Sequence, residues 1–154
     1  IARLVVEKLF GTVTGKRLAI LGFAFKANTN DTREAPAIRI CRDLLEEGAQ
    51  LAIHDPKVAA HQMARDLQQE AAPQADALSG TGSWAEASSV EDALKGADAV
   101  LVLTEWQEYG DLNWMALAGQ MRKPAWVFDA RAITDHEQVR AAGLTCWCVG
   151  DGEG

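Results

Sequence analysis

A chain of 154 residues with a formal net charge of −7 is long enough to bury one continuous core. Its acidity argues against nucleic acid or an anionic membrane as the main partner, although a small anionic ligand needs only a few local cations. The 48% hydrophobic and 24% charged residues exclude a disordered polymer, and no apolar run approaches the roughly 18 residues that cross a bilayer.

The first ten residues run at helical spacing, with apolar side chains at Ile1, Val5 and Leu9. Because this helix starts without a methionine, we interpret residues 1–12 as the end of a helical region that precedes the domain. Residues 13–150 are then expected to form the domain itself, and residues 151–154 a frayed tail.

Short apolar runs alternate with amphipathic segments along the rest of the chain. The runs predict buried strands of the parallel kind, over residues 17–21, 50–54, 83–85, 99–103, 125–129 and 144–149. Helices are expected over about 33–47, 58–72, 89–95, 113–121 and 134–142, with a loop over 73–82. Pro36 lacks an N–H group and fits only in a first helical turn, which places the start of its helix near residues 33–35.

Strands that alternate with helices predict an α/β fold: a three-layer α/β/α sandwich around a mostly parallel, Rossmann-like sheet of five to six strands. Such a sheet binds ligands at the carboxyl ends of its strands, near the point where the strand order reverses. The segments expected at that edge are GFAFKANTNDTRE, DPK, TEW and ARAIT.

The first of these segments carries a single glycine where a dinucleotide fingerprint needs three. Lys26 supplies a mobile positive charge, Arg33 supplies a planar fork of donors, and Phe25 could cover a sugar or a base. Asp31 and Thr32 precede the expected helix, so they could lie beside a phosphate at its N-terminus or simply cap it. These two interpretations stay open, and only a pyrophosphate lying flat on a glycine turn is disfavoured.

Three further residues at this edge have a structural as well as a functional interpretation. Arg131 follows a buried strand and could contact a ligand, but on position alone an ordinary surface arginine is the simpler interpretation. Asp55 stands where a Rossmann unit holds a ribose, yet Pro56 beside it favours a turn. Trp106 could stack on a base or cover the sheet, and we favour the cover. No catalytic constellation can be assigned.

Three cysteines are too few for a disulfide framework, so we expect reduced thiols in a cytoplasmic protein. Cys41 lies on the apolar stripe of a predicted helix, where a thiolate is disfavoured. Cys146 and Cys148 share one face of a predicted strand, but the histidines are scattered along the chain. Buried structural thiols are therefore favoured over a zinc site.

At the edge segments the sequence resembles one family. LGFAFKANTNDTREAP, HDPKV, LTEW and VFDAR, in this order, are similar to the C-terminal domain of the UDP-glucose/GDP-mannose dehydrogenase family. FAFK, NDTRE and TEW together point to its UDP-glucose 6-dehydrogenase members. The resemblance runs from LVVEKLFGTVTGKRLAILGFAFK to about Val149, which is nearly the whole chain.

The resemblance implies a role for each segment. The residues that match the UDP-sugar-contacting loop are Phe25, Lys26, Asp31 and Thr32. Arg131 matches a substrate-contacting arginine, although Ala132 follows it where some relatives have a second basic residue. Arg33 matches an arginine that reaches the NAD bound by an N-terminal domain. The glycine fingerprint would belong to that domain.

The resemblance also implies an NAD-dependent enzyme that oxidises UDP-glucose to UDP-glucuronate in two hydride transfers, through a cysteine-linked intermediate. Its catalytic residues would lie outside this chain, so no catalytic residue or metal ligand is assigned here and the isolated domain is expected to be inactive. Implied partners are the UDP-sugar and the N-terminal and central domains of a homo-oligomeric enzyme. Two alternatives remain: a GDP-mannose or UDP-N-acetylmannosamine dehydrogenase domain, and a non-enzymatic flavodoxin-like interaction module.

Overall fold

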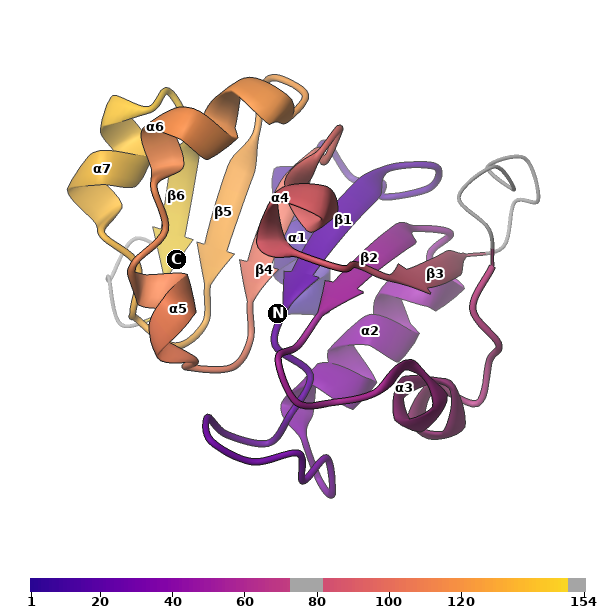
Figure 1. Ribbon diagram of the computed structural model, residues 1–154. Helices are drawn as coiled ribbons and strands as arrows, with labels where there is room; N and C mark the ends of the chain where they lie inside the picture. The colour runs from indigo at the N-terminus through magenta and orange to yellow at the C-terminus, as the bar shows by residue number, and fades with distance from the viewer. Residues whose placement is uncertain (73–81, 150–154) are drawn as a thin grey trace.

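The computed structural model describes residues 1–72 and 82–149. Within these ranges the strands form one six-stranded sheet with the order β3-β2-β1-β4-β5-β6, and every pairing is parallel (Figure 1). The strands are β1 (Arg17–Leu21), β2 (Gln50–His54), β3 (Ser83–Glu86), β4 (Ala99–Val102), β5 (Trp126–Asp129) and β6 (Thr145–Cys148). The predicted α/β fold with a parallel sheet is therefore confirmed.

Helices cover both faces of this sheet. They are α1 (Ala2–Lys8), α2 (Pro36–Glu46), α3 (Ala60–Leu67), α4 (Val90–Leu94), α5 (Gln107–Gly110), α6 (Trp114–Leu117), the 3-10 turn η1 (Ala118–Gln120) and α7 (His136–Ala141). Buried side chains of α1, α2 and α3 join one core cluster, and those of α4 to α7 join the other. In β1, Leu18 and Ile20 face the first cluster, whereas Ala19 and Leu21 face the second. This alternation explains why residues 18–21 of β1 form an uninterrupted apolar run.

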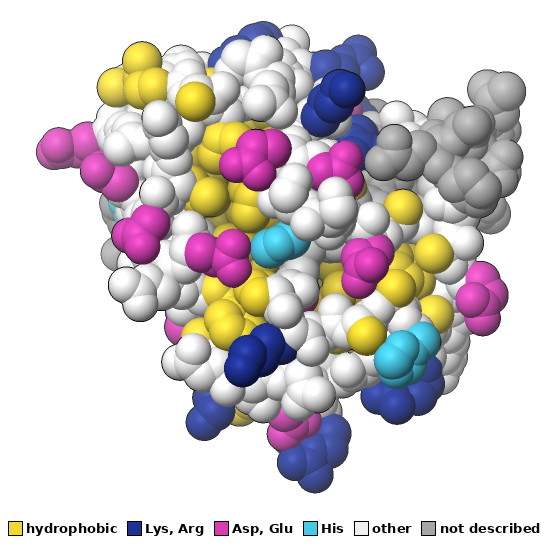
Figure 2. Space-filling model, viewed as in Figure 1, with side chains coloured by type: hydrophobic (Ala, Val, Ile, Leu, Met, Phe, Trp, Pro, Cys, Tyr) yellow, Lys and Arg dark blue, Asp and Glu magenta, His cyan; other side chains and the backbone are white. Residues whose placement is uncertain are grey.

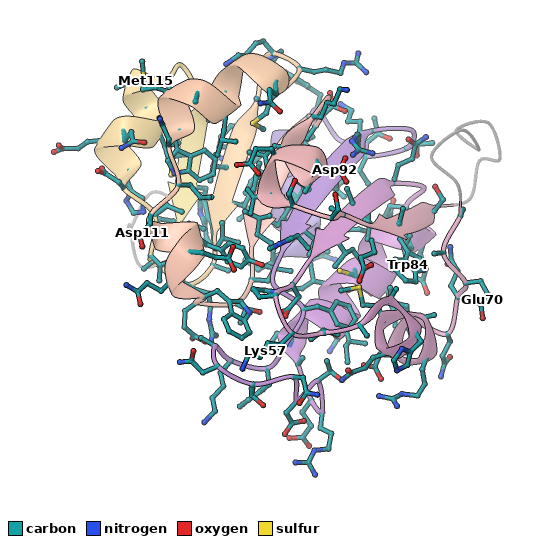
Figure 3. All side chains as sticks on the ribbon, viewed as in Figure 1. Lys57, Glu70, Trp84, Asp92, Asp111 and Met115 are labelled. Carbon is teal, nitrogen blue, oxygen red and sulfur yellow. The ribbon has the colours of Figure 1, made fainter. Side chains whose placement is uncertain are left out.

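The polar helix expected after β2 ends earlier than its pattern indicates. α3 stops at Leu67, and Gln68 takes a left-handed backbone conformation with φ 56°. Trp84 of β3 accounts for this, because its Nε1 donates to the Gln69 carbonyl at 2.9 Å and its own carbonyl accepts the Ala72 N–H at 2.9 Å (Figure 3). A long-range pairing with the sheet edge replaces the last helical turns.

Other differences from the expected elements are small. The helix expected over 113–121 divides into α6 and η1, and the short helix α5, with buried Tyr109, was not expected. α2 begins at Pro36, just after the range 33–35 that the sequence indicated, with Ala35 at the N-cap position. The expected loop over 73–82 and tail over 151–154 lie almost entirely outside the described residues. Among the described helices, none is long and apolar enough to cross a membrane.

Candidate functional site

The carboxyl ends of β1, β2, β4 and β5 meet at one edge of the sheet. The chain runs outward from β1 to β2 and β3 and then returns to β4 on the other side of β1, so the strand order reverses between β1 and β4. The loop after β1 projects beyond the arrowheads at this edge (Figure 1). Lys and Arg side chains are visible along the same lower margin in Figure 2, and Lys57 lies there in Figure 3. An acidic chain therefore has local cations at the edge where a parallel sheet binds ligands.

Gly22 lets the chain leave β1 against the end of β4. Its φ is +100°, and a Cβ added to it would lie 2.4 Å from the Cβ of Thr104. The Thr104 hydroxyl donates to the Ala24 carbonyl at 2.8 Å, which holds the departing chain in this position. The one glycine of this loop thus serves close contact between two loops, rather than contact with a phosphate.

Asp55 anchors the same loop from the other side. Its Oδ2 accepts the backbone N–H groups of Phe23 and Ala24 at 2.8 and 3.0 Å and the indole N–H of Trp106 at 3.2 Å. Its Oδ1 accepts two backbone N–H groups of the following turn, at 2.8 and 3.1 Å. The turn interpretation of Asp55 is supported, and its carboxylate has no acceptor left for a ribose. Trp106 is 6% exposed and covers the sheet.

Glu105 joins the first loop to the segment after β5. Its Oε1 accepts the Ala27 N–H at 2.7 Å, and its Oε2 accepts a hydrogen bond from a terminal guanidinium nitrogen of Arg131. Burial would raise the pKa of Glu105, but the Ala27 N–H and the Arg131 guanidinium outweigh it and hold this pKa below its ordinary value. Through Glu105, Arg131 in the loop after β5 is therefore linked to Ala27, the residue that follows Lys26 in the loop after β1.

Glu105 is the residue that sequence analysis did not single out at this edge. The only available signal was its position in TEW, directly after a buried strand. Its two partners lie 78 and 26 residues away, so no local pattern could have connected them.

The loop after β1 presents two of the predicted site residues to solvent. Its neck is closed by a hydrogen bond from the Phe25 N–H to the Asp31 carbonyl at 2.8 Å. The Phe25 ring is 45% exposed, and Lys26 is also exposed. Asp31 accepts hydrogen bonds from the Arg33 backbone N–H, Nε and a terminal guanidinium nitrogen at 2.9, 3.0 and 2.9 Å. The hydrogen bonds from Arg33 lower the pKa of Asp31 to about 2, with a smaller contribution from the charge of Lys26.

The capping interpretation of Asp31 and Thr32 is wrong. α2 begins at Pro36, and its N-cap residue Ala35 provides no side-chain hydrogen bond. The hydroxyl of Thr32, which is 3% exposed, donates to Asp66 of α3 at 2.5 Å instead. Thr32 thus holds the base of the loop, whereas Asp31 orients Arg33.

Three potential metal ligands do converge within the described residues. One ligand atom each from Asp129, His136 and Cys148 lie within 4.8 Å of one another, although the sequence had indicated scattered histidines. The Asp129 Oδ2 already accepts hydrogen bonds from the Ile133 N–H, the Thr134 N–H and the Thr134 hydroxyl at 2.9, 2.8 and 2.6 Å. This carboxylate shapes the loop after β5, and a metal ion would have to compete with those bonds. The sequence interpretation of Cys41 as an inert thiol agrees with its full burial, which raises its pKa.

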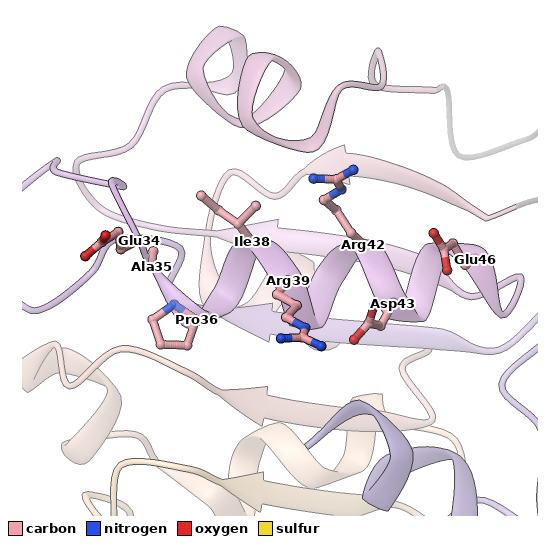
Figure 4. A pocket seen from close by; sticks show the side chains of 8 residues that line it. All are labelled: Glu34, Ala35, Pro36, Ile38, Arg39, Arg42, Asp43 and Glu46. Atoms are coloured by element: carbon pink, nitrogen blue, oxygen red, sulfur yellow. The ribbon is translucent and has the colours of Figure 1, made fainter.

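A groove also runs along the outer side of α2, from Glu34 at the end of the first loop to Glu46 (Figure 4). Its charged residues are Arg39 and Arg42 and the acidic Glu34, Asp43 and Glu46. Because the carboxylates outnumber the guanidinium groups, this groove does not attract an anion. The cations of the sheet edge are the better candidates for a phosphate ligand.

Comparison with known proteins agrees with this geometry. The profile of the "UDP-glucose/GDP-mannose dehydrogenase family, UDP binding domain" matches residues 19–136. The UDP-glucose 6-dehydrogenase of Drosophila melanogaster is 42% identical over 146 residues, covering 95% of this chain and 30% of that protein. UDP-glucose 6-dehydrogenase 4 of Oryza sativa subsp. japonica is 41% identical over 153 residues, covering 95% of this chain and 32% of that protein. The chain thus spans about a third of the length of these relatives.

Solved structures show the same fold. The structure of an NDP-N-acetyl-D-galactosaminuronic acid dehydrogenase from Methanosarcina mazei Go1 has a TM-score of 0.72 at 22% identity, covering 96% of this chain and 27% of that one. A UDP-glucose dehydrogenase from Pyrobaculum islandicum has a TM-score of 0.64 at 25% identity, covering 94% of this chain and 28% of that one. The sheet edge, the cation-bearing loops and the profile match lead to one assignment: this chain belongs to the UDP-glucose/GDP-mannose dehydrogenase family and corresponds to its UDP binding domain.

Proposed function

We propose that the chain is the UDP-sugar-binding part of an NAD-dependent UDP-glucose 6-dehydrogenase. The full enzyme would oxidise the C6 alcohol of UDP-glucose to the carboxylate of UDP-glucuronate, with two NAD reduced and one water consumed. The relatives with 41–42% identity carry this enzyme's name. The observation that carries the proposal is the Glu105 bridge, because it puts Arg131 beside the Lys26 loop and so allows both cations to reach one diphosphate.

Each proposed contact follows from the chemistry of its side chain. Lys26 is an exposed point charge that can follow a phosphate oxygen, whereas Arg131 offers a planar set of donors, one of which pairs with Glu105 before a ligand arrives. Phe25, half exposed beside Lys26, would cover the sugar or the uracil ring. Asp31 and Thr32 would act by holding Arg33 and the base of the loop, respectively.

The described edge of this sheet lacks the open glycine turn and the unoccupied acidic acceptor with which a Rossmann unit holds NAD. Gly22, the single glycine of the first loop, packs against Thr104. Backbone and indole N–H groups already donate to the carboxylate of Asp55. We therefore propose that a separate N-terminal domain binds the cofactor, to which Arg33 alone would reach from this chain. The other partners we propose are the central domain and further copies of the same enzyme.

Titration calorimetry of the 154-residue chain with UDP tests this proposal. Wild type should bind UDP in a salt-sensitive manner, and K26A and R131A should each weaken binding about ten- to hundredfold, the usual effect of losing one charged contact. The matched control is K95A, which also removes one exposed lysine charge but lies beside Arg17 at the amino end of β1.

The alternatives give different results in the same titration. Equal or tighter binding of GDP would indicate a sibling specificity for GDP-sugars. A folded wild-type chain indifferent to both nucleotides would contradict the proposal and favour a non-enzymatic interaction module. Equal losses in K26A, R131A and K95A would show that only net charge matters.

A further inference from the structure

The cation proposed for the diphosphate already holds an anion of the chain itself. A terminal guanidinium nitrogen of Arg131 donates to Glu105 Oε2, and the two side chains are 31% and 35% exposed. Carboxylate and phosphate oxygens are acceptors of the same kind for a guanidinium. A phosphate that approaches Arg131 therefore meets a site with an anion in place.

The surroundings leave the Arg131 side chain free to exchange partners while its backbone stays fixed. The Arg131 N–H donates to Asp129 Oδ1 at 3.0 Å, and Asp129 is fully buried. Glu105 is held less firmly, since its other oxygen accepts a single N–H, that of Ala27. Partial exposure of both partners gives an incoming anion direct access to the ion pair.

We propose that Glu105 is an internal counter-ion that occupies Arg131 until the diphosphate of the ligand displaces it, and that it thereby sets the affinity of the site. This inference rests on the proposed function, because it names a residue that tunes the same site. Only a ligand with phosphate groups near Arg131 competes with the carboxylate.

The test is calorimetric titration of E105Q with UDP, inorganic pyrophosphate and uridine. Gln keeps an acceptor for the Ala27 N–H but removes the competing charge, so UDP and pyrophosphate should bind roughly two- to fivefold more tightly, the scale of a partly exposed ion pair. Uridine, which has no phosphate, should bind as it does to wild type. The control E108Q makes the same charge change three residues along the chain, at an exposed position, and should match wild type.

Two further variants separate competition from other effects. In an R131A background, E105Q should no longer change the affinity for UDP, because no guanidinium remains to be released. A gain that persists without Arg131 would reduce Glu105 to a general repulsive charge and overturn the inference. E105A also removes the Ala27 acceptor, and weaker UDP binding by both E105Q and E105A would overturn it too, by showing that Glu105 only supports the loop.

Failure of the inference is distinguishable from failure of the proposed function. If wild type binds UDP and E105Q binds it equally well, the proposed function stands and the counter-ion role is wrong. If wild type, E105Q and E108Q all ignore UDP and pyrophosphate while keeping their native melting transitions, both are wrong.

Discussion

Replacement of Asp129 by Asn tests how the loop that carries Arg131 is built. The Asp129 side chain is fully buried and accepts four hydrogen bonds, one at Oδ1 from the Arg131 N–H and three at Oδ2 from Ile133 and Thr134. Asn has the same shape and keeps one acceptor oxygen. Its NH₂ group, however, faces N–H or O–H donors and cannot accept their hydrogen bonds. Hydrogen bonds to a charged acceptor contribute about 1.5–3 kcal/mol each to stability, and the amide keeps some of these bonds. The free energy of unfolding of D129N should therefore be about 2–4 kcal/mol lower than that of wild type. A domain of ordinary stability, about 5–15 kcal/mol, would still fold.

Urea unfolding followed by tryptophan fluorescence measures this loss, with D111N as the control. Asp111 is exposed at the C-cap of α5, so the same change there should cost less than about 0.5 kcal/mol. Equal unfolding free energies for D129N and D111N would show that the Asp129 bonds contribute nothing net.

The same substitution has a pH signature. Burial would raise the pKa of Asp129, but the hydrogen bonds from Thr134 and Arg131 outweigh it and lower this pKa below its ordinary value. A depressed pKa in the folded state adds stability above the unfolded value near 4, and this stability is lost as the pH falls through the folded value. The difference in unfolding free energy between wild type and D129N should therefore become smaller below about pH 4. If this difference stays constant until the protein unfolds in acid, Asp129 is not ionised in the folded state.

Two further substitutions probe the contacts that shape the edge. G22A should lower the free energy of unfolding in urea by about 2–4 kcal/mol, because it forces a left-handed backbone on Ala and places a methyl group against Thr104. An unchanged urea midpoint would disprove this close contact. Y109F should lose about 1–2 kcal/mol in the same assay, because the hydroxyl bonds both Nδ1 and the carbonyl of His54 at 2.9 and 3.0 Å, and a neutral result would show that water replaces it.

Much of the fold could be predicted because its signals are local. The runs RLAIL and QLAIH became β1 and β2 with the predicted bounds, since the central positions of a strand covered on both faces favour apolar side chains. Ser89 caps α4 by accepting the Asp92 N–H, as its sequence position indicated. These features depend on neighbours within a few residues.

Predictions failed where a distant partner replaced a local one. Thr32 has the residue type and position of a helix cap, but its hydroxyl donates to Asp66, 34 residues later. α3 ended early because Trp84 holds the chain that follows it. In both cases a polar group could bond either to a near neighbour in the sequence or to a distant residue, and the packing of the elements decides which bond forms.

The order of residues along the chain was enough to establish the alternating elements, the parallel sheet and the edge on which its loops lie, since these follow from periodicity and chirality. The meeting of Lys26 and Arg131 required the assembled sheet. They lie in the loops that follow β1 and β5, and these two strands are separated by β4. Glu105, in the loop after β4, bridges the Ala27 N–H and the Arg131 guanidinium. Strand order depends on how helices pack across the whole domain, and no short stretch of sequence encodes it.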